Sequence, residues 1–228
     1  KKAIHRDRAD LTDAQFRTAA GLDNTSFRNI IAMAGGLEVW QRGAGASASI
    51  AVGASTTAYT ADRWYLATGA NQASVVSAQA GLTNGSRLCA QVQRNSGQTG
   101  TTRGFFAIPL TTNEVARLRG QNVAVSFTIA TGANWSPASG TIGIFLGIGT
   151  GAEGKRAGTP FAGETAPINT TQNLTQGQAA TRYTFVSAGT VATNGTAGEL
   201  QFFIDWAGTA GANDYFQVDD VQIEAVPT

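Results

Sequence analysis

The residues best suited to chemistry are aromatic side chains that stand beside polar groups. Trp135 lies in the segment 134–137, whose Asn, Ser and Pro are typical of a loop, where an aromatic residue has little core to join. Trp206 directly follows Asp205, and Tyr65 lies in an aromatic pair with the tryptophan before it. Flat aromatic faces can stack on sugar rings, while carboxylate and amide groups bind sugar hydroxyls. Trp135, Trp206, Asp205 and Tyr65 are therefore the predicted ligand-binding residues.

Each of these residues also has a structural interpretation. Trp135 could plug its own loop, and Asp205-Trp206 could simply end a strand before a glycine-rich loop. Two other tryptophans, Trp40 and Trp64, each lie close to an arginine and a carboxylate in the sequence. Buried aromatics with Arg-Asp pairs mostly close the ends of a β-sandwich core. We therefore interpret Trp40 and Trp64 as architectural, with two exposed indoles on one concave face as the alternative.

The residues needed for most enzymatic mechanisms are scarce. His5 is the only histidine and Cys89 the only cysteine, so a Ser-His-Asp or Cys-His unit would need the terminal His5 to reach a folded pocket. A glycosidase needs two suitably placed acids. Acids are available, but none has a sequence neighbourhood that would clearly raise its pKa: Glu153, Glu164, Glu199, Asp205 and Asp214. The sequence therefore favours a protein without enzymatic activity.

Charge and hydropathy exclude two further classes of partner. The net charge is +1 and charged residues make up 14% of the chain, so no concentrated basic surface favours nucleic acid. No apolar run approaches the ~20 residues of a membrane helix, so we expect no membrane insertion.

The elements that must position these residues are mostly strands. Apolar and polar residues alternate with period two in 123–129, and in 142–148 large aliphatic residues alternate with Gly and Phe145. The stretches 183–185, 200–204 and 215–224 predict further strands, and turn signals such as Asn84-Gly85 separate the strands. The glycines of 142–148 would let another backbone or a ligand approach closely. Residues 111–119 predict one short helix without a capping box. The chain is therefore predicted to be all-β, an antiparallel sandwich.

The last predicted strand changes phase in its middle. Phe216 and Val218 share one face, whereas Val221 and Ile223 share a face in the opposite register. The intervening Asp219-Asp220 should therefore form a β-bulge that absorbs one extra residue.

Residues 1–34 read differently from the rest and are predicted to form an N-terminal arm, followed by the sandwich at 35–228. A short helix at 11–20 has Thr12 as N-cap and ends before Gly21. The apolar run that follows it contains Phe27, Ile30, Ile31 and Met33. This run could pack on the sandwich or grip another subunit, and we favour the second interpretation.

Two motifs carry a resemblance to a known family. The segments Glu38-Val-Trp40-Gln41-Arg42-Gly43 and Tyr59-Thr-Ala-Asp62-Arg63-Trp64 resemble the start of the jelly-roll, carbohydrate-binding-like modules of phage and prophage tail fibres. The resemblance continues through 116–127 and 216–224, and covers about residues 35–226.

The resemblance implies a jelly-roll sandwich that recognises a host surface polysaccharide as a receptor-binding component of a virion. It also implies a homotrimer, attached to other virion proteins through the arm. Related sandwiches often hold a structural calcium between a first-strand Glu and a last-strand Asp, which here are Glu38, Asp219 and Asp220. Glu38 could instead be solvated. The competing function is a structural head or tail decoration protein without glycan binding.

Overall fold

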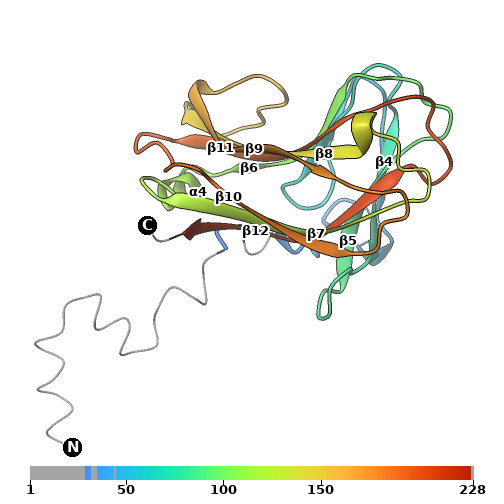
Figure 1. Ribbon diagram of the computed structural model, residues 1–228, viewed down its shortest axis with the longest axis horizontal. Coiled ribbons are helices and arrows are strands. Elements are labelled where there is room, and N and C mark those ends of the chain that lie inside the picture. Colours follow the sequence, from blue (N-terminus) through green and yellow to red (C-terminus); the bar gives the residue numbers. More distant parts are fainter. Residues whose placement is uncertain (1–28, 32–34, 44, 227–228) are drawn as a thin grey trace, which may run out of the picture.

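The computed structural model describes residues 29–31, 35–43 and 45–226, and these form two antiparallel six-stranded sheets packed face to face (Figure 1). Sheet A has the order β1 (Ser49–Val52), β4 (Ser74–Ala80), β5 (Leu88–Arg94), β12 (Tyr215–Val226), β7 (Asn122–Thr131) and β10 (Thr181–Val186). Sheet B has the order β2 (Thr57–Tyr59), β3 (Tyr65–Ala67), β6 (Arg103–Leu110), β11 (Ala197–Asp205), β8 (Thr141–Thr150) and β9 (Ala162–Asn173). The predicted all-β jelly-roll sandwich is confirmed.

The core lies between the two sheets and follows from the period-two alternation. On β8, the side chains of Ile142, Ile144, Leu146 and Ile148 are fully buried against sheet A. Trp64 stacks on Phe106, with ring centroids 4.8 Å apart, and is itself fully buried. The interpretation of Trp40 and Trp64 as architectural is supported, since Trp40 is only 6% exposed.

The predicted bulge lies in the last strand. The register between β12 and β7 shifts between Asp219 and Gln222, and Asp220 has a positive φ of 46°. The extra residue lets apolar side chains on both sides of the bulge enter the core, as the phase change indicated.

Among residues 45–226, short helical segments lie between the strands: η1 (Gly45–Ser47), α4 (Thr112–Ala116) and η2 (Ala138–Gly140). The prediction that the helix near 111–119 lacks a capping box was wrong. Its N-cap is Thr111 rather than Thr112, which places Glu114 at the third helical position, where its carboxylate accepts the Thr111 N–H.

The described part of the N-terminal region packs on its own sandwich. Ile30 N–H donates to the Ile223 carbonyl at 2.9 Å, and Ile30 and Ile31 are 7% and 1% exposed. For these residues, packing on the sandwich is the correct interpretation, because β12 offers a partner within the same chain. The helix expected at 11–20, together with Phe27 and Met33, lies outside the described residues. Within the described part of the chain, no helix has the length and apolar character needed to span a membrane.

Candidate functional site: the outer face of sheet B

The outer face of sheet B carries a continuous row of side chains across all six strands. Strand registers place these residues opposite one another, so their side chains point to the same side of the sheet. The row spans five strand spacings, or about 24 Å. Its members are Tyr59, Tyr65, Ala107, Gln201, Phe145 and Asn169, and a parallel row contains Ala67, Phe105, Phe203, Gly143 and Thr171.

Glycines on β8 make room for the aromatic rings of this face. A Cβ atom at Gly143 would lie 2.0 Å from the Phe203 ring, and one at Gly147 would lie 2.5 Å from the Phe145 ring. The rings therefore occupy space that side chains of β8 would otherwise fill. The sequence predicted that another backbone or a ligand would approach these glycines, whereas the groups that approach Gly143 and Gly147 are aromatic side chains of the same sheet.

Two ion pairs stand over these rings. Arg103 lies 4.0 Å from the Phe203 ring centroid and donates two hydrogen bonds to Asp205, at 2.7 and 2.6 Å. Arg156 lies 4.5 Å from the Phe145 ring centroid and donates two to Glu164, at 2.7 and 2.8 Å.

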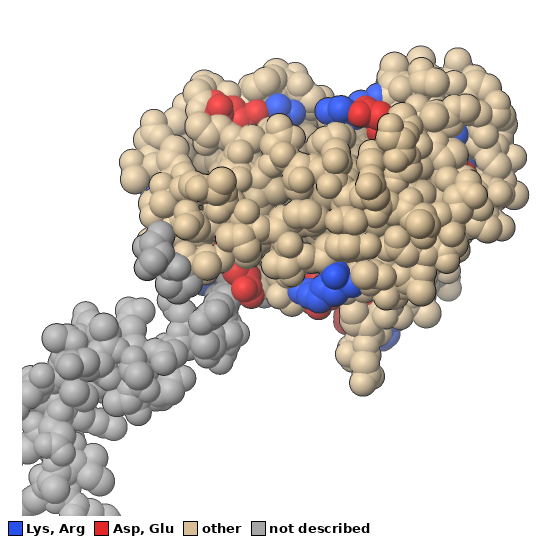
Figure 2. Space-filling view, viewed as in Figure 1, with Lys and Arg blue, Asp and Glu red and all other residues tan. Residues whose placement is uncertain are grey.

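The two ion pairs differ in exposure. The side chains of Arg103 and Asp205 are 46% and 45% exposed, and Arg103 lowers the pKa of Asp205 by hydrogen bonding. The side chains of Arg156 and Glu164 are mostly buried. Acidic and basic side chains accordingly gather along the hollowed upper edge in Figure 2, where sheet B lies. Of the four predicted ligand residues, Asp205 is the one whose side chain is exposed on this face.

The β8–β9 loop, residues 151–161, covers part of the face through a buried polar cluster. The Glu199 carboxylate accepts hydrogen bonds from Tyr65 Oη at 2.7 Å, Gln201 Nε2 at 2.6 Å and the Arg156 N–H at 2.8 Å. The Ala157 N–H donates to Tyr65 Oη at 3.0 Å. Burial raises the pKa values of Glu199 and Tyr65. The predicted ligand residue Tyr65 is thus fully buried and supports the loop from below.

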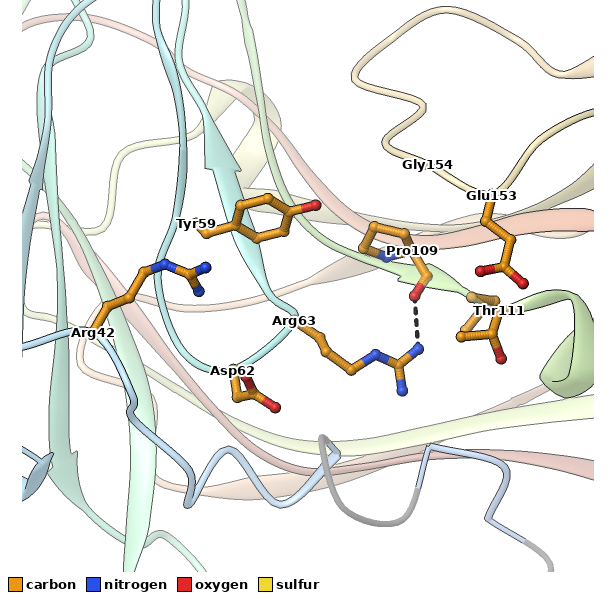
Figure 3. A pocket seen from close by; sticks show the side chains of 9 residues that line it. Arg42, Tyr59, Asp62, Arg63, Pro109, Thr111, Glu153 and Gly154 are labelled. Carbon is orange, nitrogen blue, oxygen red and sulfur yellow. Dashed lines mark hydrogen bonds between the residues drawn. The ribbon is translucent and has the colours of Figure 1, made fainter.

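A pocket of ≈ 470 Å³ lies next to the β2 end of the row (Figure 3). This volume falls within the range of small-molecule sites. The lining residues are Arg42, Tyr59, Asp62, Arg63, Pro109, Leu110, Thr111, Glu153 and Gly154.

Arg63 shapes the wall of this pocket. It has a positive φ of 66°, donates to Glu114 at 2.7 and 2.6 Å, and donates to the Pro109 carbonyl at 2.9 Å. Arg63 thus pairs with Glu114, whose carboxylate the N-terminus of α4 brings to the pocket wall.

Trp135 and Trp206 lie inside the sandwich rather than on this face. They are 2% and 4% exposed and pack edge to face, with ring centroids 5.7 Å apart. A fully buried Arg94–Asp214 pair holds the surrounding loops, and Arg94 lies 4.8 Å from the Trp206 ring centroid. Indoles in this position have no open face for a sugar, so the prediction of Trp135 and Trp206 as ligand-binding residues does not fit the structure.

The three residues predicted to hold calcium are engaged by protein donors instead. Asp219 accepts hydrogen bonds from Leu82 N, Thr83 N, Ser86 Oγ and Asp220 N at 2.7–3.3 Å. Glu38 accepts the Arg87 N–H at 2.8 Å, and Asp220 pairs with Arg182. No group of three or more His, Cys, Asp or Glu side chains is placed to hold a metal among the described residues. As positioned, these carboxylates do not fit a calcium ion.

Sequence reasoning missed the aromatic residues that form the face. Phe145 and Phe203 stand in opposite phase to the core residues of their strands, which was the available signal. Tyr59 was noted only as part of a motif. That these residues meet in one row depends on the pairing of β8 with β11, which no local pattern specifies.

No protein-family model matches the chain, and no curated protein matches it. Several solved structures are similar to it. One is the enzymatically active domain of tailspike protein 4 from bacteriophage CBA120, at 12% identity and a TM-score of 0.48, covering 72% of this chain and only 19% of that one. A CBM4 structure has 16% identity and a TM-score of 0.40, covering 66% and 78%.

A third similar structure is a carbohydrate-binding module of the β-sandwich superfamily, with 12% identity and a TM-score of 0.48. The match covers 71% of this chain and 56% of that one. At such low identities and TM-scores, these likenesses carry no information about the ligand of this chain.

Proposed function

We propose that this protein binds a carbohydrate, without cleaving it, on the outer face of sheet B. The observation that carries this function is the aromatic row, which ends in a pocket lined by charged side chains. The partly exposed rings of Tyr59 and Phe145 offer apolar surface to a sugar ring, while Asn169 and the Arg103–Asp205 pair offer donors and acceptors for hydroxyls.

The acids of this face support binding rather than catalysis. Asp205, Glu164 and Glu114 are each held in a two-hydrogen-bond pair with an arginine, and Glu199 is buried beneath the loop. A general acid has to reach the glycosidic oxygen and carry a proton to it. Asp62 and Glu153 also line the pocket. Release of reducing ends from a bound polysaccharide, abolished by D62N or E153Q, would instead favour a glycosidase.

The biological setting belongs to the same proposal. The resemblance of the two tryptophan motifs to phage tail-fibre modules supports a receptor-binding component at the surface of a virion. There the protein would recognise a host polysaccharide as a homotrimer attached to other virion proteins. A structural decoration protein without glycan binding is the alternative function.

The test compares glycan-array binding of the wild-type protein with Y59L and F145L, which keep apolar volume and remove a partly exposed flat ring. Each substitution should lower affinity roughly tenfold, which corresponds to the loss of ~1.4 kcal/mol of ring contact. Y215L is the matched control, because Tyr215 is a half-buried aromatic on sheet A. An intact wild-type protein that binds no glycan would favour the structural alternative.

A further inference from the structure

Two cationic side chains surround one aromatic ring at the mouth of the pocket. Lys155 Nζ lies 4.2 Å from the Tyr59 ring centroid, and Arg42 Cζ lies 5.1 Å from it. Both residues are exposed, and neither forms an ion pair with an acid in the part of the chain that the structure describes. Their N–H groups are thus available to a bound anion, with which a cation forms its strongest hydrogen bonds.

The acids of the pocket gather on its other side, around Arg63. The hydrogen bond from Arg63 to Glu114 raises the pKa of Arg63, and the charges of Asp62 and Glu153 raise it further. In Figure 3 the Asp62 carboxylate points away from the Arg42 guanidinium, and Glu153 lies across the pocket beside Thr111. The pocket therefore has a basic half at Tyr59 and an acidic half at Arg63.

We propose that the pocket binds an acidic sugar residue of the glycan, an inference that rests on the proposed carbohydrate-binding function. The anionic group of the sugar lies beside the Tyr59 ring and accepts hydrogen bonds from Arg42 and Lys155. The hydroxyls of the same sugar donate to Asp62 and Glu153 in the acidic half. A carboxylate and a sulfate ester share this chemistry, and the probes below separate them.

The test measures retention on immobilised polysaccharides at two salt concentrations. Polygalacturonate, alginate and hyaluronan are each compared with the same polymer after carboxyl reduction, and dextran sulfate is compared with dextran. The acidic form should bind at least tenfold more tightly than its reduced partner, with binding weakening as salt rises. R42Q and K155Q should each remove most of this preference. R87Q, which deletes an exposed charge at the β4–β5 turn, should leave it unchanged.

The outcomes separate the two proposals. Equal binding of acidic and reduced forms, sensitive to F145L but not to R42Q or K155Q, overturns the acidic-sugar inference and leaves carbohydrate binding intact. Absence of binding to every polymer, in acidic or reduced form, overturns both. Retention of dextran sulfate alone supports the inference and assigns the anion to a sulfate ester. Equal losses in R42Q, K155Q and R87Q indicate unspecific charge attraction and overturn it.

Discussion

The pairing of Arg63 with Glu114 fixes the pocket wall and should make stability depend on pH. Burial raises the pKa of Glu114, but the hydrogen bonds from Arg63 and Thr111 outweigh it, so the pKa lies below its ordinary value. A carboxylate with a lowered folded-state pKa stabilises the fold above its unfolded pKa, and this contribution is lost as pH falls through the folded value.

We predict that E114Q lowers the free energy of unfolding by about 1–2 kcal/mol at neutral pH. Glutamine retains the capping interaction, so the change isolates the ion pair. The difference from wild type should vanish in acid, as followed by urea unfolding across a pH series. D220N, in the exposed Arg182–Asp220 pair, should have a much smaller effect at every pH. A deficit of E114Q that persists in acid would contradict the ion-pair explanation.

The hydrogen bonds of the Asp219 carboxylate bear on the calcium site predicted from the sequence. Its carboxylate accepts four hydrogen bonds, three of them from the β4–β5 turn, and so ties that turn to the bulge of β12. We expect D219N to destabilise the protein by about 2–3 kcal/mol, because the amide N–H₂ of asparagine would face N–H or O–H donors that now bind a carboxylate oxygen. EDTA should leave the melting temperature unchanged. A rise in melting temperature on adding calcium, absent in D219N, would restore the calcium site predicted from the sequence.

At the scale of elements, β8 contributes to both the core and the binding face, because its alternate residues point to opposite sides of sheet B. G143A would place a methyl group against the Phe203 ring, which must then move. We predict a loss of about 1–3 kcal/mol in stability together with weaker glycan binding. G189A is the control, since a Cβ there meets nothing within 4 Å. Thermal unfolding and array binding, measured on the same samples, would show whether the two losses occur together.

The strands and the bulge could be predicted from the sequence because they depend on local alternation. The β8 stretch and the phase change at Asp219-Asp220 are examples, each readable within ten residues. The face could not be predicted, because Phe145 and Gln201 meet only through strand pairing. Trp135 looked like a loop aromatic, yet the loops held by Arg94 and Asp214 fold it into the core.

At the scale of the whole molecule, Ile30 and Ile31 belong to the core of the sandwich although they precede residue 35. Deleting residues 1–34 removes two buried isoleucines and should cost about 3–6 kcal/mol. Deleting residues 1–28 leaves them in place and should preserve stability in urea unfolding. Light scattering on the shorter deletion then tests the predicted role of the N-terminal residues in assembly. An unchanged oligomer would show that assembly is encoded in the sandwich.

The ring over Gly143 has a consequence for how related proteins could diverge. Phe203 fills the volume that a β8 side chain would occupy on the neighbouring strand, so the two positions together hold one ring. Exchanging them, as in G143F with F203G, would shift that ring by one strand, about 4.8 Å, at constant volume. Such paired exchanges would let the spacing of the sugar contacts change while the core beneath stays the same. Ligand specificity would then change through the position of a ring along the row of strands. Sequence comparisons would show this as correlated substitutions at paired positions of neighbouring strands.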